Sequence, residues 1–141
     1  MTADYVLDTD HISLLQRGDK KVLERFGDVQ EDSVASSIVS YEEQLRGRLS
    51  IVRRARTPDE LVVAYQRLRE MQEFFCVIRI IDFGADVAEV YRDLRRLHST
   101  VGAMDLRIAA TALSIYGKLV TRNTKDFETI AGLQLENWAR S

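Results

Sequence analysis

Cysteine and proline are almost absent from this chain of 141 residues: each occurs once, as Cys76 and as Pro58. A single cysteine cannot form an internal disulfide, so we expect a reducing compartment, the cytoplasm. Cys76 stands in an apolar run and is expected to be a small buried side chain. Glycine is also sparse, with seven scattered residues. Since no segment has the composition of a linker, we expect one domain over residues 1–141.

Long apolar runs and an excess of one charge are missing as well. The apolar runs are too short to cross a membrane, and Asp4 stands where a secretion signal needs positive charge. We therefore expect neither membrane association nor export. The formal net charge of −2 does not indicate a general nucleic-acid-binding protein. The arginines are nevertheless uneven, because five of them crowd residues 46–56.

Short apolar segments alternate with longer helical patterns along the chain. We expect short strands at residues 5–7, 33–36, 77–81, 118–121 and 133–136. Helical spacing of apolar residues occupies the segments between them, including residues 58–75 and 83–97. This alternation is typical of a parallel sheet with helices on both faces. The predicted fold class is α/β, a three-layer α/β/α sandwich with a small, mostly parallel central sheet.

The first predicted strand runs directly into two aspartates, Asp8 and Asp10. They stand where a buried strand ends, and ligand sites of α/β sheets form at that edge. We expect Thr9 or Asp10 to cap the following helix, and a cap is a commoner role for Asp10 than a ligand. His11 and His98 are isolated in the sequence, and we interpret both as structural or surface residues.

Other acids stand at equivalent places. Glu42 and Glu43 follow the second predicted strand, where Ser40 and Glu43 match a capping box. Asp105 stands near the start of a later helix, and Asp126 follows the fourth predicted strand. The carboxyl ends of parallel strands share one edge of a sheet, so these distant acids can converge there.

A cluster of carboxylates indicates a particular chemistry. Several carboxylates in a small site repel one another until a proton or a cation intervenes. Oxygen ligands suit Mg²⁺ or Mn²⁺, and the absence of a His/Cys cluster argues against zinc. A cation held by acids activates water and neutralises charge during phosphodiester cleavage. The sequence therefore predicts hydrolysis of a phosphate bond.

Four segments, in this order and spacing, carry a resemblance to a known family: residues 7–10 (LDTD), 40–47 (SYEEQLRG), 104–110 (MDLRIAA) and 120–127 (VTRNTKDF). Over nearly the whole chain, from Tyr5 to Trp138, the sequence resembles the PIN-domain ribonucleases, specifically the VapC-type toxins of bacterial and archaeal toxin–antitoxin pairs. The resemblance implies a PIN-like fold and a Mg²⁺-dependent endoribonuclease, with Mn²⁺ as an alternative ion. It also implies RNA as the substrate, a small VapB-like antitoxin as the partner, and a homodimer.

The resemblance further implies a catalytic set of four acids: Asp8, Glu43, Asp105 and Asp126. Asp8 and Asp105 would bind the metal, and the carboxylates would help to orient the attacking water. Relatives often have an apolar residue before the catalytic glutamate, whereas this chain has Glu42. We expect Glu43, rather than Glu42, to face the site.

Additional residues follow from the same motifs. Asn123 would be a polar or water-mediated ligand, since some relatives have an aspartate there. Thr9 and Thr121 would orient the carboxylates with their hydroxyl groups. RNA would reach the acidic pocket past the arginine-rich stretch, at Arg46, Arg48, Arg53 and Arg54.

Two other functions stay open at this point. A haloacid-dehalogenase-like phosphotransferase would use Asp8 as its nucleophile and Asp10 as its general acid. It would leave Glu43 without a role, and the chain has no obvious cap domain. A non-catalytic PIN-like module would bind RNA or protein and use its acids to hold a structural cation.

Overall fold

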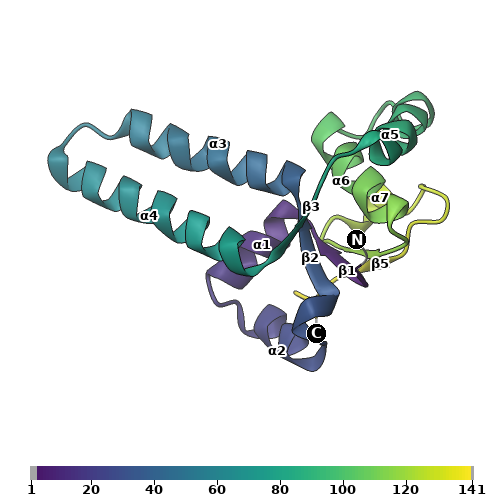
Figure 1. Ribbon diagram of the computed structural model, residues 1–141, viewed down its shortest axis with the longest axis horizontal. Coiled ribbons are helices and arrows are strands. Elements are labelled where there is room, and N and C mark those ends of the chain that lie inside the picture. Colours follow the sequence, from purple (N-terminus) through teal and green to yellow (C-terminus); the bar gives the residue numbers. More distant parts are fainter. Residues whose placement is uncertain (1–2, 141) are drawn as a thin grey trace.

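A five-stranded sheet forms the centre of the computed structural model, which describes residues 3–140 (Figure 1). The strand order is β3-β2-β1-β4-β5, and every neighbouring pair is parallel. The strands are short: β1 (Tyr5–Leu7), β2 (Val34–Ser37), β3 (Arg79–Ile81), β4 (Lys118–Val120) and β5 (Leu135–Glu136). The predicted α/β class with a small parallel sheet is confirmed.

Helices fill the connections between the strands. They are α1 (Thr9–Gln16), α2 (Lys20–Asp28), α3 (Ile38–Arg54), α4 (Pro58–Val77), α5 (Ala85–Leu97), α6 (Ala103–Ser114) and α7 (Thr124–Phe127). A short 3₁₀ turn, η1 (Glu31–Ser33), leads into β2. Between residues 3 and 140, no helix combines the length and the apolar character that a membrane span requires.

The strands place alternate side chains into two separate cores. Val6 of β1 and Leu119 of β4 face one side, where α5 and α6 cover the sheet. Leu7 and Val120 face the other side, where α1, α2 and α4 pack. Since side chains alternate along a strand, three-residue strands are long enough to contribute to both cores. This arrangement is the predicted three-layer sandwich.

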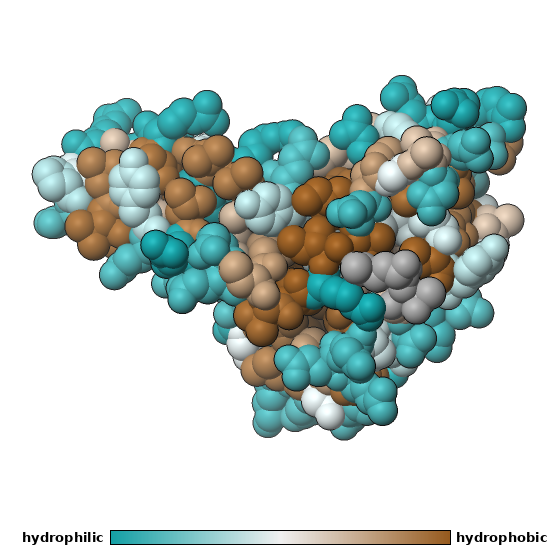
Figure 2. All heavy atoms as spheres, in the orientation of Figure 1, coloured by the Kyte–Doolittle hydropathy of each residue, from teal (hydrophilic) through white to brown (hydrophobic). Residues whose placement is uncertain are grey.

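The helices α3 and α4 form a long hairpin that extends away from the sheet (Figure 1). Its turn is fixed by a capping box, in which the Thr57 hydroxyl accepts the Glu60 amide and Glu60 accepts the Thr57 amide. Pro58 occupies the first helical turn, as its fixed φ favours. Large hydrophobic side chains remain exposed on this hairpin: Leu49, Leu61, Val62, Val63 and Tyr65. Figure 2 shows brown, hydrophobic surface over the hairpin.

Two helix caps differ from the prediction. Asp8, rather than Thr9 or Asp10, is the N-cap of α1, because the helix begins directly after the strand and the Asp8 carboxylate accepts the His11 amide at 2.8 Å. The start of α3 is likewise earlier than expected.

At that start, Ser37 rather than Ser40 is the N-cap, and its hydroxyl accepts the Ser40 amide at 3.1 Å. The predicted capping box between Ser40 and Glu43 is therefore wrong. Strand β2 extends to Ser37, so Glu43 lies in the second turn of α3 and its side chain is not needed at the helix end.

Cys76 is exposed, so the prediction of a buried cysteine is wrong. The apolar run around it is the last turn of α4 and not a buried strand, and β3 begins only at Arg79. At helical spacing Phe75 points into the core, while Cys76 and Val77 face outward. The Gln72 side-chain amide approaches the Cys76 Sγ at 3.1 Å.

Candidate active site

The four predicted acids meet at the carboxyl edge of the sheet. Asp8 follows β1, Glu43 lies on the helix after β2, and Asp126 lies on the helix after β4. Asp105 is in the first turn of α6. Burial raises the pKa of Asp105, and the negative charges of Glu43, Asp8 and Asp126 raise it further. The carboxylates are therefore close enough to interact, although they come from four separate segments.

Asp8 is held firmly at the start of α1. Its backbone amide donates to the Val120 carbonyl at 3.0 Å, which ties the end of β1 to β4. Its Oδ1 accepts the His11 amide, and the His11 Nδ1 lies 3.3 Å from the same oxygen. The side chain is only 13% exposed. Among the residues that the structure describes, no hydrogen bond ends on its other oxygen, Oδ2.

Glu43 is oriented by a short chain of hydroxyl groups. The Thr9 hydroxyl donates to Glu43 Oε1 at 2.5 Å, and the Ser40 Oγ lies 3.0 Å from the Thr9 Oγ1. The Ser37 Oγ lies 3.3 Å beyond, next to Ser40. These hydroxyls come from the ends of β1 and β2, which are neighbours in the sheet. Sheet pairing therefore brings Thr9 to Glu43.

Glu42 points elsewhere. It is exposed, and its carboxylate accepts the Arg46 guanidinium at 2.8 Å, one helical turn along α3. Successive residues of a helix point in directions about 100° apart, so Glu42 and Glu43 cannot both face the cluster. In this structure, Glu43 is the residue of the pair that lies with the other acids.

The loop after β4 shapes the last part of the site. The Asn123 side-chain amide donates to Asp126 Oδ2 at 2.7 Å. The buried Thr121 hydroxyl accepts the Asn123 backbone amide at 3.0 Å. Thr121 thus contacts the loop backbone, whereas Thr9 contacts a carboxylate directly.

Asp10 lies beside the cluster but is fully engaged. Both of its oxygens accept from Arg122, at 2.6 and 2.7 Å. This hydrogen bonding lowers the pKa of Asp10, although burial opposes the shift. Asp8, Asp10 and His11 have ligand atoms within 4.8 Å of one another. Since the oxygens of Asp10 are already occupied by a guanidinium, we do not regard these three residues as a second metal site.

His11 and Arg122 are functional candidates that the motif analysis missed. His11 is fully buried and touches Asp8, and Arg122 precedes Asn123 in the last motif. The sequence contained an indication of the His11 contact: His11 stands three residues after Asp8, a spacing that brings two side chains together across one helical turn. Arg122 stands between two motif residues, Thr121 and Asn123, at the same sheet edge.

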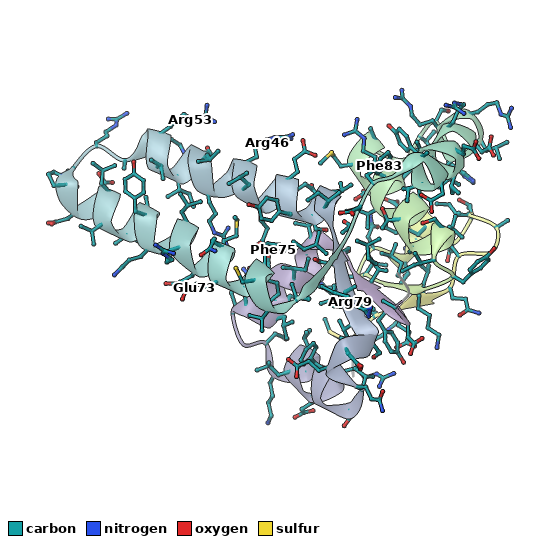
Figure 3. The ribbon with its side chains drawn as sticks, viewed as in Figure 1. Arg46, Arg53, Glu73, Phe75, Arg79 and Phe83 are labelled. Carbon is teal, nitrogen blue, oxygen red and sulfur yellow. The ribbon has the colours of Figure 1, made fainter. Side chains whose placement is uncertain are left out.

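The predicted RNA-binding arginines are spread along α3. Arg46 lies in the middle of this helix and Arg53 near its far end (Figure 3). Arg54 hydrogen-bonds to the Ser50 carbonyl at that far end. Arg48 is half-buried and faces α4, where it lines a cavity with Arg67. The structure does not gather the four arginines into one patch.

Comparisons with known proteins identify the family of this chain. The family model of the PIN domain matches residues 5–133. Ribonuclease VapC2 of Rickettsia felis is 36% identical over 77 residues, which are 52% of this chain and 58% of that protein. Ribonuclease VapC1 of Haemophilus influenzae is 26% identical over 142 residues, which cover 96% of this chain and 98% of that protein.

A solved structure extends the likeness to three dimensions. The crystal structure of VapBC2 from Rickettsia felis, bound to a DNA fragment from its promoter, matches with a TM-score of 0.76. The match has 26% sequence identity and covers 95% of this chain and 98% of that chain. The likeness therefore extends over nearly the whole fold.

Proposed function

This chain belongs to the PIN domain family, and we propose that it is a metal-dependent endoribonuclease of the VapC type, the toxin of a toxin–antitoxin pair. The observation that carries the proposal is the convergence of Asp8, Glu43, Asp105 and Asp126 at one sheet edge. A relative that aligns over almost the full chain is named as a ribonuclease. The geometry and the family support the same activity.

The donor set fits a hard divalent cation. Its members are carboxylates, the ligands that Mg²⁺ and Mn²⁺ prefer. A divalent cation would relieve the repulsion that helps to raise the pKa of Asp105. We assign Asp8 and Asp105 as ligands, with Glu43 and Asp126 completing the negative site. A bound cation would supply an activated water and would neutralise charge on the phosphate.

The protein groups around this site have separate tasks. Thr9 fixes one oxygen of Glu43, which leaves the other oxygen to orient the attacking water. Asn123 likewise donates to one oxygen of Asp126. In the hydrolysis, the water oxygen bonds to phosphorus while one P–O ester bond breaks, and the leaving oxygen takes up a proton. Fixed carboxylates reduce the reorganisation that this step requires.

RNA is proposed to approach along α3. Arg46, Arg53 and Arg54 are exposed on this helix, so their charges are accessible to phosphates. Arg46 stands nearest to the acids, because its partner Glu42 is the neighbour of Glu43. Single-stranded or looped RNA fits best, since the scissile nucleotide must leave a helix to enter the pocket.

An antitoxin of the VapB type is the proposed partner. The similar structure from Rickettsia felis is that of VapBC2. In this chain, a cavity of about 580 Å³ lies between α1, α2 and α4 and has a mostly apolar lining, which includes Leu15, Leu23, Phe26, Phe74 and Val77. An amphipathic antitoxin helix could place its apolar face in such a groove.

A homodimer is also proposed. The exposed apolar side chains of the α3–α4 hairpin give this surface the character of a contact region (Figure 2). Sedimentation of the purified chain at several concentrations measures the oligomeric state. Val62→Lys, at the exposed face of α4, is expected to shift the equilibrium towards monomer, whereas Arg69→Gln, elsewhere on α4, should not.

The phosphotransferase alternative does not fit the contacts of Asp10. Such an enzyme would need Asp10 to carry and release a proton as general acid. Here both oxygens of Asp10 bind Arg122, and the pKa of Asp10 is lowered by that hydrogen bonding. The PIN family match likewise favours the nuclease.

Cleavage of RNA by the purified chain tests the proposed function. End-labelled total cellular RNA is incubated with the chain in Mg²⁺, Mn²⁺ or EDTA, beside Asp8→Asn and Asp105→Asn. We expect discrete fragments with either metal, no cleavage in EDTA, and a loss of at least about 100-fold in both variants. Asp93→Asn, an exposed acid on α5 paired with Arg96, is the matched control and should cut normally.

Two results would contradict the nuclease. The first is cleavage by Asp105→Asn at the rate of the unmodified chain, and the second is a folded chain that binds RNA but does not cleave it with either metal. The second result would favour the non-catalytic binding module. A DNA strand of the same sequence as a cleaved RNA shows whether the ribose 2′-hydroxyl is required.

A further inference from the structure

His11 is the only fully buried histidine of the described chain and has a partner at each ring nitrogen. Its Nδ1 lies 3.3 Å from Asp8 Oδ1. Its Nε2 accepts the backbone amide of Trp138 at 3.2 Å, in a fully buried contact. The ring thus bridges the first acid of the site and a segment 127 positions further along the chain.

The Trp138 end of this bridge is well anchored. Its indole N–H donates to Glu136 at 3.0 Å, and its ring packs edge-on against Tyr5. Glu136 belongs to β5, where its carbonyl accepts the Thr121 amide at 2.8 Å. The Trp138 amide therefore has a defined position relative to the sheet.

These contacts determine where the ring proton lies. A backbone amide can only donate, so Nε2 must offer its lone pair to Trp138. A neutral imidazole then carries its proton on Nδ1, the atom that faces Asp8. The opposite tautomer would place two N–H groups against each other in a buried contact and would leave Asp8 Oδ1 facing a lone pair. One tautomer alone satisfies both ends.

We propose that His11 is a positioning residue, which uses the Trp138 amide to fix its tautomer and donates from Nδ1 to hold the Asp8 carboxylate for metal binding. With the His11 amide, the ring gives Oδ1 two donors. Oδ2 is then the oxygen left for a cation. Groups that orient a ligating carboxylate in this way commonly change metal affinity when they are removed.

The same contacts argue against His11 as a metal ligand. Ligation through Nδ1 would require the ring proton to move to Nε2, towards the Trp138 amide. The ring is also fully buried, whereas the acids of the site are only partly covered. The inference rests on the proposed function in so far as Asp8 is taken as a metal ligand, but the tautomer can be measured without any metal.

Nitrogen NMR of the full chain, labelled with ¹⁵N-histidine, tests the tautomer directly. The chain contains two histidines, so His98→Gln assigns the spectrum. We expect the proton of His11 on Nδ1 and an unprotonated Nε2, as the contact with the Trp138 amide requires. A proton on Nε2, or on both nitrogens, would overturn the proposal. On adding Mg²⁺, the Nδ1 signal should shift while its proton remains; loss of that proton would mean direct ligation and would also overturn it.

Two substitutions separate the two ends of the bridge. In His11→Asn, the side-chain amide can take the place of Nδ1 and donate to Asp8, but it cannot reach Trp138. In His11→Gln, the longer side chain can accept from the Trp138 amide, but its donor is no longer placed at Asp8. Mn²⁺ binding to RNA-free protein is measured by calorimetry, and thermal unfolding is measured on the same samples.

We expect His11→Gln to weaken Mn²⁺ binding by about tenfold or more, and His11→Asn to remain within about threefold of the unmodified chain. His98→Gln is the control and should bind Mn²⁺ normally. Equal weakening in both His11 variants, or none in His11→Gln, would contradict a positioning role. If the unmodified chain bound no Mn²⁺, the proposed function would fail, and the NMR result would still decide the tautomer. If neither variant folds, the NMR measurement on the unmodified chain decides the proposal.

Discussion

The Arg122 guanidinium donates two hydrogen bonds, of 2.6 and 2.7 Å, to the carboxylate of Asp10, which is 112 positions away in the sequence. Asp10 lies in the first turn of α1, and Arg122 lies in the loop that leads to Asn123 and Asp126. The pair therefore joins two segments that each supply acids to the site. A two-pronged guanidinium–carboxylate contact fixes orientation as well as distance.

Breaking this pair is expected to affect cleavage more than stability. Both side chains are about half exposed, so Arg122→Met should lower the free energy of unfolding by only about 0.5–1 kcal/mol. The same change should reduce kcat by roughly tenfold, because the loop that carries Asp126 loses its anchor. Unfolding in urea and single-turnover cleavage measure the two effects. A double-mutant cycle with Asp10→Asn should show coupling between the residues, and additive effects would mean that they act independently.

Asp105→Asn should stabilise the protein when no divalent cation is present. Burial and neighbouring negative charges raise the pKa of Asp105, so the fold disfavours its ionised form. A carboxyl group whose pKa is higher in the folded than in the unfolded protein lowers the free energy of unfolding at pH values above the folded pKa. This destabilisation decreases as the pH falls through the folded pKa and is absent below the unfolded pKa. In EDTA at neutral pH, we expect the Tm of Asp105→Asn to be roughly 2–4 °C above that of the unmodified chain, and this difference in Tm should disappear in acid.

In saturating Mg²⁺, the unmodified chain should have a higher Tm than Asp105→Asn, the reverse of the order in EDTA. A ligand that binds only the folded chain stabilises it, and Asp105→Asn removes a proposed ligand. The unmodified chain should therefore gain Tm with Mg²⁺ and overtake the variant. A variant that gained as much as the unmodified chain would show that Asp105 does not contribute to metal binding.

Glu136 gives the fold a pH-dependent contribution. Burial opposes its ionisation, but hydrogen bonds from Trp138, Lys118 and Arg25 outweigh burial and lower the pKa of Glu136. A lowered pKa means stability that is present above the ordinary glutamate range and is lost as the pH falls through the lowered value. We expect Glu136→Gln to cost about 1–2 kcal/mol at neutral pH and much less in acid. Urea unfolding at several pH values checks this, and a gap independent of pH would contradict it.

Arg46 and Arg48 are expected to differ in their effects on RNA. Arg46 is exposed one helical turn from Glu42, so Arg46→Gln should raise KM several-fold and lessen its dependence on salt. Arg48 is half-buried, and its Nε is buried without a hydrogen-bond partner among the described residues. Burial and the neighbouring Arg67 lower the pKa of Arg48.

Arg48→Met should therefore leave stability unchanged or slightly increased, since it removes an unsatisfied polar group. Its KM for RNA should change less than that of Arg46→Gln. Steady-state cleavage of one labelled oligoribonucleotide, with thermal unfolding of each variant, compares them. A larger KM effect at Arg48 would show that RNA enters the cavity between α3 and α4.

Local patterns in the sequence determined the fold class. The alternation of short strands and helical segments predicts the parallel sheet, and acids that follow its strands, such as Asp8 and Asp126, are expected at its carboxyl edge. The order of these motifs also carried the resemblance to the PIN domain, which the family match confirms. Strand and helix ends were less accurate, and α2 was not predicted, because few residues decide where an element stops.

The tertiary structure alone decided which side chains from distant segments contact one another at the site. Glu42 and Glu43 are adjacent in the sequence, and the pairing of β1 with β2 brings Thr9 to Glu43. Likewise, nothing near His11 in sequence indicates that Trp138 fixes one side of its ring. Strand position follows from local periodicity, whereas hydrogen bonds between distant segments depend on strand order and side-chain direction, which exist only once the sheet has formed.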